Sequence, residues 1–490
     1  MYLTLWALAC CMALYFLPSL PVFALNISTT TAEILAPISD FAETNPPEHA
    51  ITPVWLVIPF IALLLMIATG PLFYEHFWHR HYPKIAIGLG VLVVMYYLLV
   101  LHNHHQPVHA MMEYIQFISL LTALFVASGG ILIQVDRRST PLANVGLLLT
   151  GAVLSNLIGT TGASMLLIRP YIRMNKGHIQ AYHIVFFIFM ISNAGGLLTP
   201  IGDPPLFLGF LKGVPFFWTL ENNLAPWALA LGFLALVFYL VDKRYGNTES
   251  LTSLYEPIYT NQIAISGKKN FLWLSLIIIA VFLDPNVMDW VPAISYGGQK
   301  ISFLREIIML SVAFLSYRFA DPKALKGNEF TFEPIREVAF IFVGIFATMM
   351  PALELAGIFA KSPGGAALIN HNTLYWGTGA LSAVLDNAPT YLNFLAAAMA
   401  SRGVDITQVD QVRNFALNPE SSFELLAISV ASVLFGAMTY IGNGPNFMVK
   451  SIAEQNGIKM PSFFGYVIRF SLPILLPILL LIWIVFFALA

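Results

Sequence analysis

A glycine- and proline-broken stretch occurs twice in this chain, and it limits the folds that the chain can adopt. The first copy runs from Gly195 to Pro205 and reads Gly-Gly-Leu-Leu-Thr-Pro-Ile-Gly-Asp-Pro-Pro. The second runs from Gly436 to Phe447 and reads Gly-Ala-Met-Thr-Tyr-Ile-Gly-Asn-Gly-Pro-Asn-Phe, with Asn443 in the place of Asp203. Two helix breaks at equivalent places in two halves are typical of the substrate site of a secondary transporter.

The composition places this pattern in a membrane. Of the 490 residues, 58% are hydrophobic and only 10% are charged, and the mean hydropathy is +0.75. A soluble core of this size cannot bury so much apolar surface, so we predict an all-α polytopic membrane protein in contact with the lipid bilayer. Apolar runs such as Asn270 to Leu283 and Ser302 to Phe319 are expected to cross about 30 Å of hydrocarbon.

Charge and cysteine usage exclude other classes. The formal net charge of -2 provides no basic surface for nucleic acid. The two cysteines, Cys10 and Cys11, are adjacent, so neither a disulfide framework nor a cysteine metal site is expected. We therefore expect no cofactor, with sodium as the coupling or transported ion.

Two segments, 141–168 and 372–400, differ from ordinary spans. Each is apolar at both ends, but polar and helix-breaking residues interrupt its middle, at Ser155 to Gly162 and at Asp386 to Thr390. Non-helical backbone at membrane depth is tolerated where protein or a watery cavity satisfies it. We interpret the two segments as re-entrant hairpins.

The distribution of basic residues predicts the orientation of these elements, because cytoplasmic loops carry the excess of Lys and Arg. With the residues after Ala24 outside, loop 74–84 with Arg80 and Lys84 lies inside, and loop 102–109, which lacks Lys and Arg, lies outside. The first hairpin then enters from the cytoplasm and the second from outside. The same order of span, hairpin and broken helix thus appears twice in opposite orientation, an inverted-topology repeat. A chance recurrence in a chain rich in Gly, Pro and Leu is the alternative.

The chain is expected to divide at the boundaries of these repeats. A retained transmembrane helix is the alternative to a signal peptide at the N-terminus. The predicted parts are a signal peptide (1–24), an external segment (25–52), N-terminal transmembrane helices (53–110), a first inverted repeat (111–241) with hairpin 141–168 and broken helix 180–211, a cytoplasmic loop with linking helices (242–336), and a second inverted repeat (337–490) with hairpin 372–400 and broken helix 421–453.

Asp203 and Asp386 are the principal candidates for chemistry. A carboxylate near the bilayer midplane is costly and marks an ion or proton pathway by default. Asp203 has a structural alternative, as the N-cap of a half-helix that starts at Pro204 and Pro205. For Asp386 the alternative is a hairpin-tip carboxylate that reaches water and only caps the returning helix.

Neutral oxygen atoms surround these carboxylates in the sequence. Unwound carbonyls, hydroxyls and carboxamides are ligands of hard cations, and a broken helix exposes such carbonyls. We predict that Asp203 and Asp386 bind sodium. The full set of predicted ion- or substrate-binding residues is Ser155, Asn156, Thr160, Thr161, Thr199, Gly202, Asp203, Asp386, Asn387, Thr390, Thr439, Gly442 and Asn443.

Other ionisable residues are weaker candidates. Glu113 and Glu354 stand near the ends of spans and are expected at the interface, and His183 is expected near a membrane surface. The histidines of loop 102–109 could bind a metal or sense pH, but simple solvation is the expected state of such a loop.

An intramembrane aspartyl protease is a minor alternative. Such proteases use two membrane aspartates and a Pro-Ala-Leu motif, and this chain has Gly202-Asp203 and Pro351-Ala352-Leu353. The order argues against an enzyme, because the Tyr-Asp motif of these proteases precedes their Gly-x-Gly-Asp motif. Here Asp386 follows both motifs and is preceded by Leu385, and Pro200 stands where the first Gly belongs.

At these residues the chain resembles the ion transporter superfamily of secondary carriers, which includes NhaD-type sodium/proton antiporters, citrate and dicarboxylate carriers and arsenite carriers. The resemblance covers Met111 to Leu489 and rests on the two hairpin tips and the two Thr-x-Ile-Gly-[Asp/Asn]-x-Pro breaks. It implies a scaffold domain, a transport domain with both hairpins, a homodimer, elevator-like movement and a place in the bacterial inner membrane.

The chain departs from the dicarboxylate carriers at two positions. Those carriers typically have a neutral Ser-Asn-Thr at both tips and a neutral residue after the first Ile-Gly, whereas this chain has Asp386 and Asp203. Added carboxylates repel an anion and attract cations. A sodium/proton antiporter is therefore our expectation, and a cation-coupled citrate or dicarboxylate transporter is the alternative.

Overall fold

The computed structural model describes residues 52–136, 139–245, 262–285, 288, 290–296 and 299–488. The predicted signal peptide and nearly all of the external segment lie outside these residues. Within them, nine segments are long and apolar enough to cross a membrane. The prediction of an all-α polytopic membrane protein is confirmed. Two short antiparallel pairs of strands accompany the helices: β1 (Leu132–Asp136) with β2 (Gln262–Ser266), and β3 (Ile294–Tyr296) with β4 (Gln299–Ile301).

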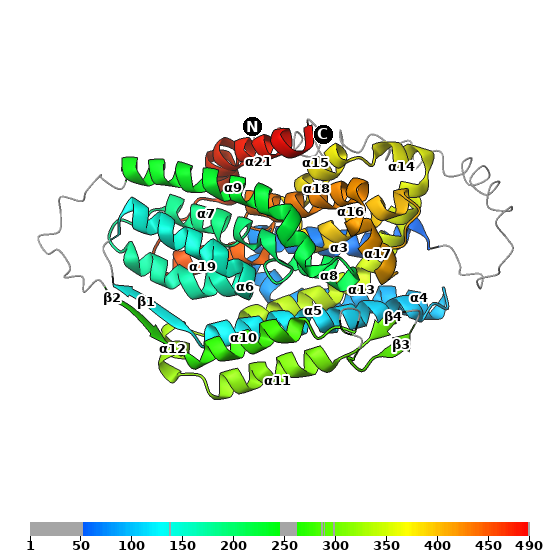
Figure 1. The fold of residues 1–490 in the computed structure, drawn as a ribbon, viewed down its shortest axis with the longest axis horizontal. Helices are drawn as coiled ribbons and strands as arrows, with labels where there is room; N and C mark the ends of the chain where they lie inside the picture. The colour runs from blue at the N-terminus through cyan, green and yellow to red at the C-terminus, as the bar shows by residue number, and fades with distance from the viewer. Residues whose placement is uncertain are drawn as a thin grey trace, which may run out of the picture. The chain divides into compact units, whose positions relative to one another are not determined.

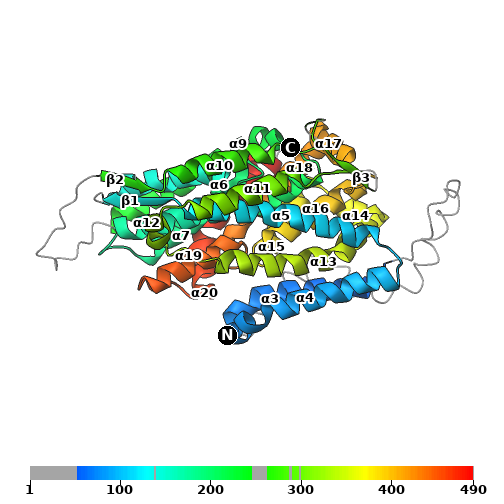
Figure 2. The same ribbon diagram turned by 90° about the horizontal axis from the view of Figure 1, so that it is seen from below.

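One group of helices surrounds α5 and α13. In this group α13 packs against α4 and α5, while α10 and α11 lie side by side along α5 (Figures 1 and 2). The members are η2 (Val54–Val57), α3 (Ile58–Phe73), α4 (Glu75–Leu99), α5 (His105–Gly129), α10 (Lys269–Val281), α11 (Leu304–Arg318), α12 (Pro322–Gly327) and α13 (Glu333–Lys361).

The helices α10 and α11 correct one expectation. The apolar runs Asn270 to Leu283 and Ser302 to Phe319 were expected to span the membrane, but α10 has 13 residues and α11 has 15. A helix needs about 20 residues to cross the hydrocarbon core at 1.5 Å per residue. Neither helix is long enough by itself to cross the membrane. The residues next to α10 and α11 form turns and strand β4 and do not extend the helices.

The first predicted hairpin is α6 (Pro141–Met174), which folds back on itself at Gly159. Gly159 has φ 77° and ψ 153°, a conformation that residues with a side chain rarely adopt. A straight helix of 34 residues would separate its ends by about 50 Å. Instead, the Asn144 side-chain amide donates to Asn175 Oδ1 at 3.0 Å, so both ends of α6 meet at one side.

The second hairpin consists of α15 (His371–Ser382) and α16 (Asn387–Ser401). The two helices pack against each other, with Gly377 of α15 beside the ring of Phe394 of α16. The hairpins occupy equivalent places, because α6 packs against α5 and α16 packs against α13. The opposite orientation of the two halves in the membrane stays a prediction.

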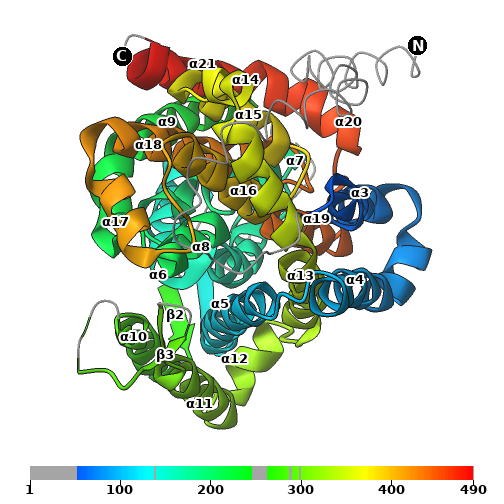
Figure 3. The ribbon, with the colours of Figure 1, turned by 90° about the vertical axis from the view of Figure 1, so that its right-hand side faces the viewer.

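Each hairpin is followed by a broken helix. The first is α7 (Ala181–Met190), η3 (Ala194–Leu198) and α8 (Pro204–Lys212), and the second is α18 (Pro419–Phe435), η4 (Gly436–Met438) and α19 (Gly444–Gln455). The remaining helices are α9 (Phe216–Tyr245), α14 (Pro363–Leu368), α17 (Val409–Leu417), α20 (Phe463–Tyr466), η5 (Val467–Leu475), α21 (Leu476–Trp483) and η6 (Ile484–Ala488). Figure 3 shows α18 and α16 with α9 and α21 nearby.

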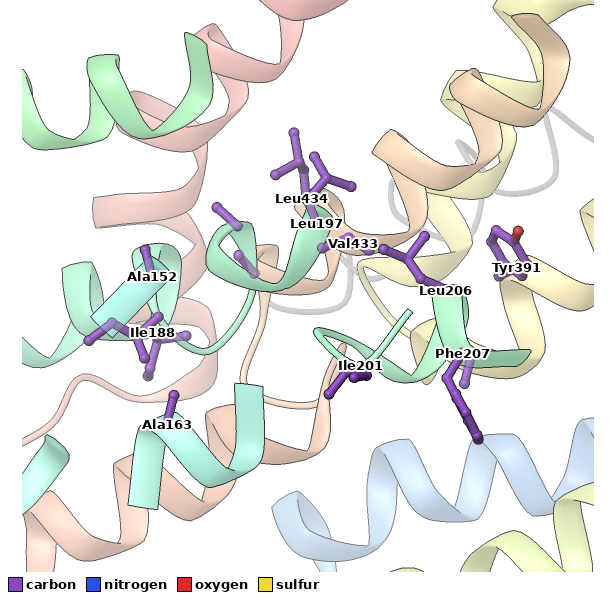
Figure 4. Packing of buried hydrophobic residues seen from close by; sticks show 14 of the residues in the cluster. Ala152, Ala163, Ile188, Leu197, Ile201, Leu206, Phe207, Tyr391, Val433 and Leu434 are labelled. Atoms are coloured by element: carbon purple, nitrogen blue, oxygen red, sulfur yellow. The ribbon is translucent and has the colours of Figure 1, made fainter. Parts of the chain in front are cut away.

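The core of the protein is packed around the two broken helices. Both α7 and α18 are mostly apolar and largely buried, so little of either helix is left to face solvent or lipid. Ile188 and Leu197 of the first half lie in one apolar cluster with Val433 and Leu434 of the second (Figure 4). The helix breaks are therefore held inside the protein, away from the lipid-facing surface.

Candidate functional site

Asp203 occupies the N-cap position of α8, but its side chain does not cap that helix. Pro204 and Pro205 hold the first two helical positions and have no backbone N–H to offer. The N–H of Leu206 bonds instead to the backbone carbonyl of Asp203 at 3.1 Å. The carboxylate is thus free to make other contacts. The alternative role of Asp203 as an N-cap accounts for its backbone conformation and not for its side chain.

Three neutral side chains from three other segments converge on the Asp203 carboxylate. Thr160 Oγ1 donates to Oδ1 at 2.8 Å, Asn387 Nδ2 donates to Oδ2 at 2.6 Å, and Asn443 Nδ2 donates to Oδ1 at 3.0 Å. Asp203 is 1% exposed. Among the described residues, no Lys or Arg lies within salt-bridge distance of this buried carboxylate. Such a group costs free energy unless a cation or a proton neutralises it.

The first helix break is fastened to the first hairpin through Thr199. Its hydroxyl donates to the Asn156 carbonyl at 2.6 Å and accepts the N–H of Gly202 at 3.1 Å. The Asn156 side chain accepts the N–H of Leu198 at 2.9 Å. Backbone groups freed by the break are therefore satisfied by the hairpin.

The second break repeats this arrangement in the other half. Thr439 donates to the Ala383 carbonyl at 2.6 Å and accepts the N–H of Gly442 at 3.1 Å. The recurring sequence motif thus builds the same local structure twice. Its glycines are required by close approach, because a Cβ on Gly202 would lie 2.2 Å from the Gly196 carbonyl oxygen.

Asp386 caps the returning helix of the second hairpin. Its Oδ1 accepts the N–H of Ala388 at 3.0 Å, and its carbonyl accepts the Thr390 hydroxyl at 2.9 Å. The residue is half-buried and makes no hydrogen bond to Asp203, although the next residue, Asn387, does. The cap is the role visible for Asp386, and its predicted part in sodium binding stays a prediction.

The other residues predicted at the hairpin tips make mainly structural contacts. Ser155 donates to the carbonyls of Gly151 and Ile191 at 2.9 and 2.8 Å, which joins the hairpin to the end of α7. Thr161 is half-buried and follows Thr160 without reaching Asp203. The residues that contact the carboxylate are therefore Thr160, Asn387 and Asn443.

Two carboxamides that the sequence reasoning missed join the breaks of the two halves. Asn193 Nδ2 donates to Asn446 Oδ1 at 2.7 Å, and Asn443 Nδ2 lies 3.2 Å from Asn193 Oδ1. Asn446 also donates to the carbonyls of Gly436 and Thr439 at 2.8 and 2.9 Å. Neither Asn has a polar counterpart at the equivalent position of the other half, so the repeat gives no sequence signal for them.

Among the predicted site residues that the structure describes, Asn387 carries the one fully buried side-chain oxygen without a hydrogen-bond partner. Its Oδ1 is fully buried and has no partner, while its Nδ2 bonds to Asp203. An unsatisfied buried carbonyl oxygen costs about 1–3 kcal/mol. Carboxamide and carboxylate oxygens such as those of Asn387 and Asp203 are of the kind that hard cations prefer as ligands.

The weaker candidates lie away from Asp203. Glu113 Oε1 pairs with Lys212 Nζ at 2.6 Å, and Glu354 accepts the Thr52 hydroxyl. His183 is fully buried within the protein, and its place near a membrane surface stays a prediction. The described residues contain no group of three or more His, Cys, Asp and Glu residues that could hold a metal ion.

Comparison with known proteins supports transport as the class of function. No curated protein matches the chain. Residues 49–487 match the model of a family described as "putative citrate transport". This match covers both hairpins and both helix breaks, so the site around Asp203 lies wholly within it. The chain is an integral membrane protein that belongs to this citrate transport family.

Proposed function

We propose that the protein is a secondary active transporter that moves citrate or a similar carboxylate together with a cation. Membership of the citrate transport family supports a carboxylate over the sodium/proton exchange expected from the sequence. The observation that carries the proposal is the buried Asp203 carboxylate, which has neutral donors only.

The charge of the site supports coupling to a cation. A polycarboxylate that approaches a buried carboxylate is repelled, and the repulsion is strong where water is excluded. Because no Lys or Arg among the described residues pairs with Asp203, the compensating charge must come from a bound cation or a proton. The substrate and the cation therefore bind together or not at all.

Asp203 and Asn387 Oδ1 would supply the first oxygens of the cation site. In the present structure the Asn387 amide group fills the space beside the carboxylate. Rotation of that amide would turn Oδ1 toward the same place and replace a donor by an acceptor. Thr160 can remain bonded through its lone pairs, since a hydroxyl both donates and accepts.

A sodium/proton antiporter is the second candidate, and the same carboxylate favours it. A group that holds either Na⁺ or H⁺, but not both, exchanges the two ions without any further device. Asp203 and Asp386 would then both bind sodium. Among the described residues, no Lys or Arg forms an ion pair with Asp203, which fits a site for cations alone as well as a coupled site.

Transport assays on purified protein in proteoliposomes distinguish cation-coupled carboxylate transport from sodium/proton exchange. We expect labelled citrate to accumulate under an imposed sodium or proton gradient, and we expect citrate to stimulate the cation flux. Sodium-dependent proton movement without citrate, in vesicles that accumulate no citrate, would instead establish the antiporter. Protein-free vesicles and the Asp203→Asn variant are the controls. A homodimer and a location in the bacterial inner membrane complete the proposal.

A further inference from the structure

Two histidines on successive turns of α5 face each other. His105 is the first residue of α5, and His109 lies one turn further along the helix. Their Nε2 atoms are 3.3 Å apart, and their ring centroids are 4.3 Å apart. Because residues four positions apart are neighbours on a helix surface, the helix itself brings the two rings together. The proposed transport makes no use of this pair.

The helix turn that carries the pair is held in place by the residue before it. Asn103 Oδ1 accepts the backbone N–H of His105 at 3.0 Å and that of Gln106 at 3.2 Å. These N–H groups have no partner within a helix that begins here, so the Asn103 side chain stabilises the first turn. His105 is exposed and His109 is half-buried, which leaves the pair open to a small ion from solvent.

The distance between the rings suits a shared metal ion. Two nitrogen ligands that each lie about 2.0–2.1 Å from Zn²⁺ in a tetrahedral site are about 3.3–3.4 Å apart. The two Nε2 atoms are 3.3 Å apart. A hydrogen bond to nitrogen as donor is most often shorter, at about 2.9–3.0 Å. The observed spacing therefore fits a metal between the rings better than it fits a proton alone.

The chemistry of the rings selects the kind of metal. Each Nε2 must present a lone pair to the ion, so the ring that holds a proton on Nε2 transfers it to its own Nδ1 and stays neutral. No proton is lost from the pair in this change. Neutral imidazole suits Zn²⁺, Cu²⁺ and Ni²⁺, whereas Mg²⁺ and Ca²⁺ prefer oxygen ligands.

The surroundings of His109 supply water and carry no net charge. A cavity of about 40 Å³ borders His109, and its charged lining residues are Glu113, Asp284, Lys212 and Lys300. Two acidic and two basic side chains balance, so the lining does not repel a cation by its net charge. A polar cavity of this size has room for water, which can complete the coordination of a metal.

We propose that His105 and His109 form a binding site for a divalent transition-metal ion, of the class of Zn²⁺, Ni²⁺ and Cu²⁺. Among the described residues no group of three or more His, Cys, Asp and Glu could hold a metal, so water supplies the other ligands. The site differs from the cation site proposed at Asp203 in its residues and in its preference for nitrogen. It does not depend on the proposed function.

Calorimetric titration with Zn²⁺ tests the site on the full chain, purified in detergent through a tag without histidine. Citrate is left out of the buffer because it chelates the metal. We expect the wild type to bind Zn²⁺ and to show no response to Mg²⁺ at the same concentration. His105→Gln and His109→Gln should each weaken this binding by at least about tenfold, since a ligand matters at least as much as the groups that orient it. His104→Gln, a neighbouring histidine outside the pair, is the matched control and should bind as the wild type does.

Electron paramagnetic resonance of bound Cu²⁺ identifies the ligands independently of affinity. The wild type should show coupling to two imidazole nitrogens, and each single variant should lose it. Gel filtration establishes that the variants are folded; if they are not, the wild-type spectrum decides alone, because a site with oxygen ligands only would overturn the proposal. Absence of Zn²⁺ binding in the wild type, or equal binding in both variants, would overturn it too. Failure to transport citrate would count against the proposed function only.

Discussion

Asn443 Nδ2 donates a hydrogen bond to Asp203 Oδ1 at 3.0 Å, although the two residues are 240 positions apart and occupy the same place in the two helix breaks. The breaks of the two halves therefore touch and form one site. Two aspartates at this distance would repel each other, and one would have to hold a proton. An amide in the second half removes that repulsion and leaves a single charge.

Asp203→Asn should abolish cation-coupled transport and leave the protein folded. The new amide oxygen can accept the bonds from Thr160 and Asn443. The new amide nitrogen would face Asn387 Nδ2, but Asn387 can rotate and present its unpartnered Oδ1. We expect a melting temperature close to that of the wild type and no stimulation of uptake by sodium or protons, measured in proteoliposomes. Normal cation dependence in this variant would exclude Asp203 as the coupling site.

The breaks and hairpins could be predicted because their signals are local. Glycine, proline and polar residues interrupt apolar runs at the positions where α6, α7 and α18 end or turn. Both Thr residues of the repeated motif lie at the breaks, where each accepts a backbone N–H of its own break; their part in ion binding stays a prediction. Local sequence also indicated that Asp386 could cap a helix, and it does so.

Contacts between distant segments could not be predicted in the same way. Nothing near Asn193 indicates that it meets Asn446, because that contact depends on how the two halves pack. The contact of His183 with Asp242 has no local signal either, because Asp242 comes from another helix. The lengths of the short helices α10 and α11 were overestimated, because the apolar residues of each run extend beyond the residues that form the helix.

Asn443→Asp should lower the stability of the protein strongly, although the two side chains have nearly the same shape. The Asn443 amide donates to the Ser192 carbonyl and Asn193 Oδ1 as well as to Asp203. A carboxylate there would face acceptors only, beside another carboxylate. We expect a loss of about 3–5 kcal/mol, as for an uncompensated buried charge, visible as a large drop in melting temperature. Asn443→Ala, which removes the donor without adding charge, should be less damaging; equal stability of the two variants would contradict this account.

Gly442→Ala should disrupt the second break, whereas Gly444→Ala should be tolerated. A Cβ on Gly442 would lie 2.6 Å from the carbonyl oxygens of Gly436 and Ser382, and both are backbone atoms that cannot move aside. A Cβ on Gly444, two residues on, has nothing within 4 Å. Fluorescence-detected gel filtration of the two variants checks this. Well-folded Gly442→Ala protein would contradict the close packing of the second break around Gly442.

Two variants of Asp386 distinguish its role as a helix cap from a role of its negative charge. Asparagine caps helices about as well as aspartate, so Asp386→Asn should keep the bond to the Ala388 N–H, whereas Asp386→Ala should lose about 1 kcal/mol. If Asp386 also binds sodium, both variants should weaken sodium-dependent transport equally. If the cap is its only role, Asp386→Asn should transport like the wild type. Thermal stability and sodium titrations on the same preparations distinguish these results.

The ion pair between Lys212 and Glu113 should hold α8 against α5. Their Nζ and Oε1 atoms are 2.6 Å apart and both side chains are largely buried. Removal of one partner from a buried pair leaves an uncompensated charge and typically costs about 3–5 kcal/mol. Lys212→Met and Glu113→Gln should therefore each destabilise the protein strongly.

The double variant Lys212→Met/Glu113→Gln should recover much of that loss, because it leaves no unpaired charge. A double-mutant cycle on melting temperatures or on denaturant unfolding measures the coupling. Since α8 has Asp203 at its first turn and Lys212 at its last, the pair also fixes the helix that presents the carboxylate. Single variants should consequently weaken cation coupling more than the double variant does. Additive losses in the cycle would mean that the two residues stabilise the fold independently and that α8 is held by its apolar contacts instead.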